Sequence, residues 1–454
     1  MSGTDGITSS ELSPVESFRE FRDNGLQVDG PSLGLENIHN YEPGGDHPVH
    51  LGDVLGGRYR VLNKLGSGTH SNVWLCSDVE REMGEKYVAV KILMADDSIP
   101  DCPELRVYKL LERGIGKTDI SRLFCFPTNR FEIQGPNGRH FAIVCPVLGP
   151  RVSKLLVSQD GDSGKRLRQI CHQVVNAMAN LHSYRLCHGD FRPPNILVRL
   201  DGLQNMSEEQ LLQVTGSPKT APVILATQRH TPNQWPSTAP KYLVRPLDWD
   251  QVNLQNPSDF FSGDICITHF GESYDTNDPP EDLGIPQEYR SPEYILDKRV
   301  GVGSDIWALG CTLFEIRTGR RLFNPAYDDP DEHLAQMVTT LGKLPEPWWT
   351  TTWEFRRRWF TDEKDAEGRP LCIMQGQNET QAMSPLASGS LEKAILSAAV
   401  CGYQDGSNFD KSNHGVIDGG EVLLFADLLG KIFRYIPEQR ITAEEILGHP
   451  WFGM

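Results

Sequence analysis

Hydrophobic positions follow two different patterns along the chain, and these predict two regions of different secondary structure. Apolar runs of strand length predict β-strands over residues 58–65, 72–77, 87–93, 139–147 and 264–268. Apolar residues three or four positions apart predict helices over 165–182 and 304–317, and a further helix is predicted over 103–112. A β-rich first region is therefore expected to precede a larger, mainly helical region.

Three stretches interrupt these patterns. Residues 1–52 are rich in Gly, Ser, Pro and acidic side chains and are predicted to form a flexible arm, with room for one short helix. Repeated prolines over about 200–262 predict an insert of loops and short extended pieces, with one helix near 207–214. A second, less regular insert is expected over about 324–421.

The composition narrows the class of protein. The chain has 454 residues, more than one ordinary hydrophobic core holds, so two lobes with insertions are expected. Its net charge of -17 disfavours sequence-independent nucleic-acid binding and suits a basic partner. The ten cysteines are scattered singly, and no signal peptide or run of about eighteen apolar residues is present. These features predict a soluble intracellular protein with reduced thiols.

Candidate chemistry is concentrated in residues 186–198, which read L-C-H-G-D-F-R-P-P-N-I-L-V. Asp190, followed five positions later by Asn195, can place a proton acceptor and a metal-binding amide at one phosphate, as phosphoryl transfer requires. The alternative is a loop in which both residues only stabilise turns. The choice depends on whether other phosphate-handling parts occur in the right order.

Such parts occur upstream. The turn G-S-G-T-H-S contains Gly66 and Gly68, which let backbone amides approach a phosphate, and Val73 beyond it can cover a planar base. Lys91 lies alone in an apolar strand, where it is either exposed or directed at phosphates. Glu104 either pairs with Lys91 or is a solvated acid in the first turn of a helix.

Two further features complete the set. Residues 147–149 are expected to form a hinge whose backbone bonds a nucleobase edge, and the preceding Pro146 offers a carbonyl but no N–H. Asp305, at the start of the helix over 304–317, either caps that helix or holds the backbone of the 186–198 loop.

These parts, in this order, resemble the eukaryotic protein kinases. They are the glycine turn, strand lysine, helix glutamate, 186–198 loop, H-F-G, S-P-E, D-I-W-A-L-G and a late arginine, from about residue 53 to 454. The stretch E-P-G-G-D-H-P-V-H-L-G-D-V-L-G-G-R-Y-R-V-L-N-K-L-G-S-G-T-H-S-N-V-W-L looks like the serine/arginine-rich-protein kinases, and E-Y-R-S-P-E-Y looks like their fungal members. The resemblance implies an α+β, bilobal fold with a small β-rich N-lobe over 53–148 and a larger, mainly helical C-lobe over 149–454.

The resemblance also implies roles for individual residues. Asp190 would accept the substrate hydroxyl proton, and Arg192 would place a positive charge near the γ-phosphate. Lys91 would hold the nucleotide phosphates, Asn195 would bind metal, and Glu293 would pair with Arg440. The implied ATP site is lined by Leu65, Gly66, Ser67, Gly68, Val73, Ala89, Lys91, Glu104, Pro146, Leu148 and Leu197.

Two positions depart from the family pattern. Gly189 stands where the family has the arginine of H-R-D, so no phosphorylation switch of the activation loop is expected. His269 stands where the family has the metal-binding aspartate of D-F-G. Magnesium prefers oxygen ligands, whereas softer divalent metals accept nitrogen more readily. Asp264 lies too far along the strand to replace that aspartate simply, and Glu272 is nearer but of unknown direction.

Two functions stay open at this point. The first is an ATP-dependent serine/threonine kinase that uses Mg²⁺ or Mn²⁺ and phosphorylates Arg/Ser-rich or similar basic proteins. The second is a pseudokinase that serves as a nucleotide- or protein-binding scaffold, because His269 replaces the metal-binding aspartate. The protein is expected to be a monomer of the cytoplasm and nucleus, without direct contact to nucleic acid or membrane. Four acidic residues either recruit a basic substrate or form a solvated face: Asp328, Asp329, Asp331 and Glu332.

Overall fold

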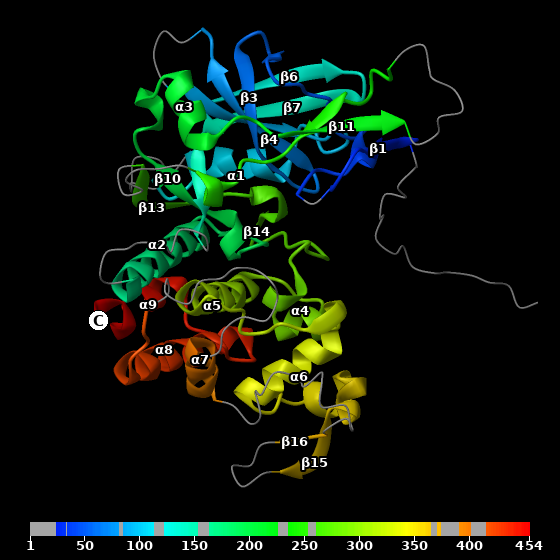
Figure 1. Ribbon diagram of the computed structural model, residues 1–454. Coiled ribbons are helices and arrows are strands. Elements are labelled where there is room, and N and C mark those ends of the chain that lie inside the picture. The colour runs from blue at the N-terminus through cyan, green and yellow to red at the C-terminus, as the bar shows by residue number, and fades with distance from the viewer. Residues whose placement is uncertain are drawn as a thin grey trace, which may run out of the picture.

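The computed structural model consists of a β-rich lobe and a mainly helical lobe (Figure 1). It describes residues 24–32, 34–80, 85–112, 122–152, 163–225, 235–252, 260–364, 370–373, 390–400 and 415–454. Within these residues, no helix is both long and apolar enough to cross a bilayer. The α+β class and the bilobal arrangement are confirmed.

The β-rich lobe is built on one antiparallel sheet of six strands. In spatial order these are β2 (Val54–Leu55), β3 (Tyr59–Ser67), β4 (Ser71–Asp78), β5 (Tyr87–Leu93), β7 (Gly138–Pro146) and β6 (Asn129–Gly135). Four predicted strands are thereby confirmed. Val73 pairs with Gly66 on one side and with Lys91 on the other. Because paired residues share a face, the Val73 and Lys91 side chains leave the sheet on the same side.

Residues 24–52 do not form the flexible arm predicted from their composition. β1 (Leu26–Val28) pairs with β11 (Thr220–Leu225), which in turn pairs with β12 (Tyr242–Val244). The arm and the insert over 200–262 therefore share one three-stranded sheet (Figure 1). The physical reason for the difference is this pairing, which satisfies backbone groups of the arm and buries its apolar side chains. Residues 1–23 of the predicted arm lie outside the described residues.

A buried ion pair joins the arm to the six-stranded sheet. Lys64 on β3 is fully buried, and its Nζ lies 2.5 Å from Glu36 Oε1. Tyr41 Oη donates a hydrogen bond of 3.0 Å to the same carboxylate oxygen. The Lys64 ammonium also lies over the Trp74 ring, 5.0 Å from its centroid. Burial lowers the pKa of Lys64, and the negative charge of Glu36 opposes this shift.

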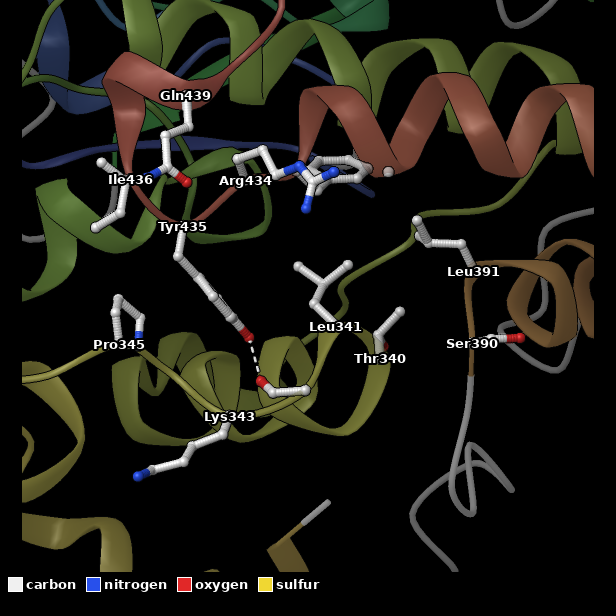
Figure 2. A pocket seen from close by; sticks show the side chains of 13 residues that line it. Thr340, Leu341, Lys343, Pro345, Ser390, Leu391, Arg434, Tyr435, Ile436 and Gln439 are labelled. Atoms are coloured by element: carbon white, nitrogen blue, oxygen red, sulfur yellow. Dashed lines mark hydrogen bonds between the residues drawn. The ribbon is translucent and has the colours of Figure 1, made fainter. Parts of the chain in front are cut away.

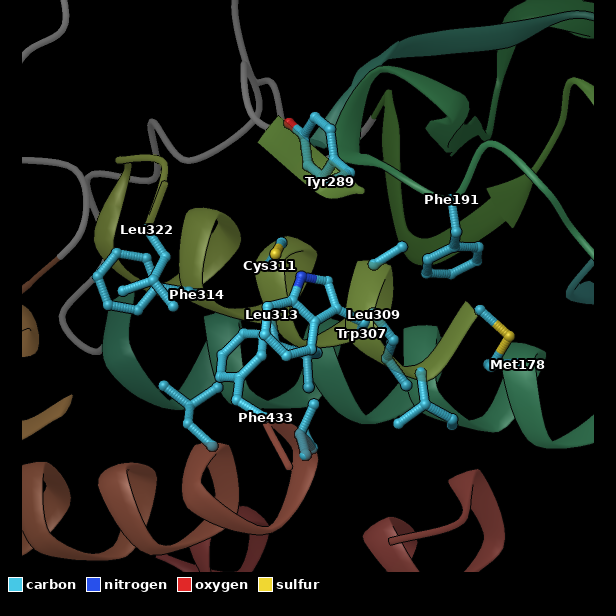
Figure 3. Packing of buried hydrophobic residues seen from close by; sticks show 14 of the residues in the cluster. Met178, Phe191, Tyr289, Trp307, Leu309, Cys311, Leu313, Phe314, Leu322 and Phe433 are labelled. Carbon is cyan, nitrogen blue, oxygen red and sulfur yellow. The ribbon is translucent and has the colours of Figure 1, made fainter. Parts of the chain in front are cut away.

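The helical lobe is organised around α5 (Val302–Thr318), which confirms the helix predicted over 304–317. Around α5, Trp307 meets Phe433 edge-on at a centroid distance of 4.9 Å (Figure 3). Trp307 also stacks on Phe323 at a centroid distance of 5.8 Å. The predicted pair of Glu293 and Arg440 is confirmed, with both guanidinium Nη atoms 2.7 Å from the carboxylate. The other helices of this lobe are α2 (Ser163–Ser183), α4 (Pro292–Asp297), α6 (Pro330–Leu341), α7 (Leu391–Val400), α8 (Gly419–Ile432) and α9 (Ala443–Leu447). By contrast, α3 (Glu208–Thr215), which belongs to the insert over 200–262, packs on the β-rich lobe, where Glu208 pairs with Arg60 of β3 (Figure 1).

Two short sheets between the lobes fix the position of the candidate site. One contains β8 (Leu148–Arg151), β10 (Ile196–Leu200) and β13 (Phe261–Ile267), in the order β13-β10-β8. The other pairs β9 (Leu186–Cys187) with β14 (Tyr274–Asp275). The loop between β9 and β10 and the loop between β13 and β14 therefore run between the same two sheets. This topology places the Asp190 segment beside the His269 segment.

A separate hairpin, β15 (Phe360–Lys364) and β16 (Pro370–Cys372), lies at the far end of the helical lobe (Figure 1). It belongs to the insert predicted over 324–421 and does not approach the two loops.

Candidate active site

The loop between β9 and β10 is held by side chains of other elements. Asp305 in α5 accepts hydrogen bonds from the backbone N–H groups of His188 (2.6 Å) and Gly189 (3.1 Å). The N-cap of α5 is Gly301, so Asp305 does not cap this helix. Of the two roles expected for Asp305, holding the backbone of the loop is the one confirmed. Gly189 has φ of +79°, and a Cβ there would lie 2.1 Å from the Glu272 carbonyl oxygen. The arginine of H-R-D therefore has no room at this position.

Asp190, Arg192 and Asn195 form one hydrogen-bonded group at the end of this loop. Arg192 Nε donates to Asp190 Oδ1 at 2.7 Å, and Asn195 Nδ2 donates to Asp190 Oδ2 at 2.7 Å. Asp190 is only 8% exposed. Because a carboxylate has about four acceptor sites, Asp190 can still accept a hydrogen bond from a substrate hydroxyl. The Asn195 amide nitrogen donates to Asp190, so its carbonyl oxygen is the side-chain atom that would hold a cation.

Lys91 and Glu104 form the predicted pair. Lys91 Nζ on β5 donates to Glu104 Oε2 in the first turn of α1 (Pro103–Glu112). Tyr108, one turn later, donates to Glu104 Oε1 at 3.3 Å. Glu104 is 5% exposed, so the alternative of a solvated acid is wrong. The pair fixes the Lys91 ammonium on the same face of the sheet as Val73.

His269 lies within electrostatic range of both groups. Its backbone is left-handed, with φ of +66° and ψ of +59°, a conformation that is uncommon for residues other than glycine. Although the residue is exposed, the surrounding protein desolvates the ring, and Lys91 adds positive charge beside it. Both effects place the pKa of His269 well below its usual range, and Asp190 opposes them only in part. The ring is therefore a neutral nitrogen donor near pH 7.

Phe270, the next residue, connects the helix of Glu104 with the loop of Asp190. Its ring is buried and meets the Tyr108 ring edge-on at 5.6 Å. It also lies 5.3 Å from the His188 ring, and His188 in turn contacts the Thr268 carbonyl through Nε2 at 3.0 Å. This packing sets the position of H-F-G relative to both groups.

Neither nearby carboxylate takes the place of the missing aspartate. Glu272 Oε2 accepts a hydrogen bond of 2.9 Å from the Gly284 backbone N–H, which settles the direction that the sequence left open. Asp264 lies on β13 with its carboxylate 4.0 Å from the Arg122 guanidinium. Both carboxylates are thus engaged elsewhere, and His269 is the residue that occupies the metal-binding position of the motif.

The residues predicted to contact a nucleobase are only partly brought together. Leu148 on β8 and Leu197 on β10 pack in one cluster, which also contains Cys145, and Cys145 pairs with Ala89 on β5. Leu65 packs instead in a different cluster, formed largely with the insert. Pro146 ends β7 directly before Leu148's strand.

The glycine turn offers fewer backbone amides than the sequence suggests. The Gly68 N–H donates to the Ser71 carbonyl at 2.9 Å within the turn, so this amide is not directed at a phosphate. Ser67 pairs with Asn72 at the end of the hairpin. A Cβ at Gly66 would meet no atom within 4 Å, so the space above that residue is open.

Comparison with known proteins decides the family. The family model described as "Protein kinase domain" matches residues 259–452. A serine/threonine-protein kinase SRPK of Physarum polycephalum is 29% identical over 339 residues, which span 71% of this chain and 75% of that protein. Protein kinase dsk1 of Schizosaccharomyces pombe is 28% identical over 408 residues, with 70% and 74% covered. A serine/threonine protein kinase of Aspergillus fumigatus is 25% identical over 457 residues, with 98% and 95% covered. This chain is an SRPK-like eukaryotic protein kinase.

The SRPK-like kinase positions its loop with three residues that the sequence did not single out. Thr268 Oγ1 donates to the Asn195 carbonyl at 3.1 Å, and Ser273 Oγ donates to the His188 carbonyl at 2.8 Å. The Thr312 hydroxyl in α5 is shared between the Phe191 carbonyl at 3.3 Å and the Ala308 carbonyl of its own helix at 2.8 Å. The position of Thr268 next to H-F-G could have indicated that it belongs to the site. Nothing in the sequence indicates this for Ser273 and Thr312, because their partners lie far away in the sequence.

A cavity of about 610 Å³ in the helical lobe of the kinase is not part of this site. It lies between the end of α6 and the end of α8, and Tyr435 crosses it to donate a hydrogen bond of 2.7 Å to the Gly342 carbonyl (Figure 2). None of the residues predicted for ATP, metal or catalysis lines it.

Proposed function

We propose that this kinase transfers the γ-phosphate of ATP to serine in Arg/Ser-rich or similarly basic proteins. The observation that carries the proposal is the Asp190 carboxylate, which Arg192 and Asn195 hold in a loop that other elements fix. Nucleotide binding alone does not need a buried proton acceptor at this position. ATP with a divalent cation supplies an activated phosphoryl group, and the residues of this chain supply position, charge and proton transfer.

In this proposal each polar residue has a distinct task. Lys91, fixed by Glu104, neutralises and positions nucleotide phosphate oxygens. Asp190 orients the substrate hydroxyl and takes its proton as the new phosphorus–oxygen bond forms. Arg192 adds positive charge next to that carboxylate, with a planar fork in place of the family's lysine.

The residues present fit a divalent cation that accepts nitrogen as well as oxygen. Asn195 offers a carbonyl oxygen, and His269 offers a neutral imidazole nitrogen. Mg²⁺ prefers oxygen ligands in a strict octahedral geometry, whereas Mn²⁺ accepts imidazole more readily. We therefore propose that Asn195 and His269 hold the cation, and that Mn²⁺ supports the reaction better than Mg²⁺.

The first prediction concerns this metal preference. Wild-type kinase should transfer labelled phosphate from ATP to an Arg/Ser-rich peptide faster with Mn²⁺ than with Mg²⁺. His269→Asp should raise the Mg²⁺-supported rate by roughly 10-fold or more, the scale on which residues around a metal alter affinity or activity. The measurement is the initial rate with each metal at equal concentration. A wild type that is silent with both metals and active only as His269→Asp contradicts the proposal and favours the scaffold alternative.

The proposed basic substrate rests on charge. The chain carries a net charge of -17, which favours encounter with Arg-rich segments. Within the acidic cluster, Asp329 caps α6, Asp331 accepts a hydrogen bond of 2.8 Å from Trp353 Nε1, and Glu332 accepts one of 2.8 Å from the Ala326 N–H. These carboxylates therefore stabilise local structure. Each keeps its negative charge and has further acceptor sites for a substrate guanidinium.

The second prediction separates these two roles. Replacing the cluster by Asp328→Asn, Asp329→Asn, Asp331→Asn and Glu332→Gln keeps the hydrogen-bond acceptors and removes the charge. The KM for an Arg/Ser-rich peptide should rise by about 5- to 10-fold, since an exposed ion pair contributes about 0.2–1 kcal/mol. The KM for an uncharged peptide and the kcat should stay unchanged.

The matched control for this variant is the double change Glu438→Gln and Glu444→Gln. It removes two exposed acids of the C-terminal segment and should leave both KM values unchanged. Equal effects of the cluster variant on both peptides would exclude docking at this cluster.

A further inference from the structure

Three cysteines from separate segments meet next to Leu148 and Leu197. Cys125 precedes β6, Cys145 lies near the end of β7, and Cys266 lies on β13, yet all three pack in one cluster with these leucines. The Cys125 N–H also donates a hydrogen bond of 3.3 Å to the Ile267 carbonyl on β13. The thiol cluster therefore connects the end of a sheet strand in the β-rich lobe with the strand that leads to His269.

The three thiols differ in access. Cys266 is fully buried and Cys125 is 5% exposed, whereas Cys145 is half-buried. Cys145 precedes Pro146 and the hinge segment and is the least buried of the three residues, so the side of Cys145 is the approach to the cluster for a small reagent. None of the three has a task in the phosphate transfer proposed above.

The three thiols also differ in acidity. The neighbouring thiols of Cys145 and Cys266 hold the pKa of Cys125 below its usual range despite its burial. The positive charge of Arg199 acts in the same direction, and its Nη2 lies 3.4 Å from Cys266 Sγ. The neighbouring Cys125 and burial raise the pKa of Cys145, and burial together with Cys125 raises that of Cys266. Cys125 is therefore the sulfur of this cluster in which the thiolate, the reactive form, is favoured.

We propose that Cys125 and Cys145 form a reversible oxidation site, at which hydrogen peroxide converts the two thiols to a disulfide. The Cys125 sulfur attacks one peroxide oxygen: a sulfur–oxygen bond forms, the oxygen–oxygen bond breaks, and the other oxygen leaves as water with the Cys125 proton. The Cys145 sulfur then attacks the Cys125 sulfur: the disulfide forms, and the second oxygen leaves as water with the Cys145 proton. The thiols lose two electrons and two protons in total, and a reducing thiol reverses the reaction.

The choice of Cys145 as the second sulfur follows from access and from its neighbours. Cys266 is fully buried and its sulfur accepts a hydrogen bond from Arg199 Nη2, whereas Cys145 is partly exposed. The disulfide links the segment that pairs with β13 to the end of β7. The oxidised kinase therefore carries a covalent connection at the boundary between its lobes.

The test is a disulfide map of the full-length chain after treatment with hydrogen peroxide, alkylation of the remaining thiols and digestion. We expect a linked peptide that contains Cys125 and Cys145, is absent without peroxide and disappears on reduction. Cys145→Ser and, independently, Cys145→Ala should abolish it, whereas Cys171→Ser, a change at another buried thiol, should retain it. The absence of this peptide from oxidised wild type, or a link from Cys125 to Cys266 in its place, would overturn the proposal. The map is made on wild type, so it depends neither on the folding of the variants nor on phosphate transfer.

Discussion

Asp190→Asn is expected to lower kcat for phosphate transfer by about 10²- to 10⁴-fold, the range that a positioned general base contributes. The Asp190 carboxylate accepts hydrogen bonds of 2.7 Å from Arg192 Nε and from Asn195 Nδ2. An amide keeps the shape of the group but offers one oxygen in place of two, and it cannot take the hydroxyl proton. Nucleotide affinity should change little, because the pair of Lys91 and Glu104 is untouched.

The control for this variant is Asp264→Asn. Asp264 is a partly exposed aspartate on β13, whose carboxylate lies 4.0 Å from Arg122, and its replacement should leave kcat unchanged. The measurement is kcat and the nucleotide dissociation constant for wild type and both variants, with thermal unfolding to verify the fold. Wild-type turnover in Asp190→Asn would reject the assignment of Asp190 as the proton acceptor.

The parts of the site that the sequence predicted correctly are those whose signals are local. Lys91 is a single cation in an apolar strand, and Glu104 stands in the first turn of the next helix, so their pairing required only that the helix pack on the sheet. The helices α2 and α5 followed from apolar spacing that continues over many residues. The sequence also indicated two roles for Asp305, capping the helix or holding the 186–198 loop, and the structure shows that it holds the loop.

The parts that the sequence could not predict depend on partners far along the chain. Leu26 pairs with Leu225, and a three-residue strand carries no periodic signal of its own. The composition of the arm, rich in small and acidic residues, indicated disorder. Composition does not reveal that a distant insert supplies a strand with which the arm pairs. Lys64 lies in a predicted strand, and nothing near it in the sequence indicates that it pairs with Glu36.

The chemistry of His269 illustrates the same limit within the site. The residue itself was visible in the sequence as a departure from D-F-G. Its protonation state was not, because the low pKa arises from desolvation and from Lys91, which the fold brings near. A charged imidazolium would repel a cation, whereas the neutral ring can donate a nitrogen to one. The fold thus keeps the His269 ring in the neutral form that the proposed metal site requires.

The buried ion pair of the arm leads to the other large expected effect. Glu36→Ala should lower the free energy of unfolding by roughly 3–5 kcal/mol, the cost of removing one partner of a buried ion pair. Lys64 is fully buried, so its ammonium would lose the carboxylate at 2.5 Å, and the Trp74 ring, 5.0 Å away, does not replace a charged partner. Tyr41 would also lose the acceptor of its hydroxyl. Chemical denaturation of wild type and variant, followed by tryptophan fluorescence, measures the difference.

A second substitution distinguishes an uncompensated charge from a simple loss of packing. Glu36→Leu combined with Lys64→Met removes both charges and keeps apolar volume, so it should recover most of the stability that Glu36→Ala loses. Glu42→Ala, a change at a less buried acid of the same segment, is the matched control and should alter stability by about 0.5 kcal/mol or less. If the double variant is as unstable as Glu36→Ala, the unpaired Lys64 charge is not the cause. In that case the arm is held mainly by its apolar contacts, which both variants disturb.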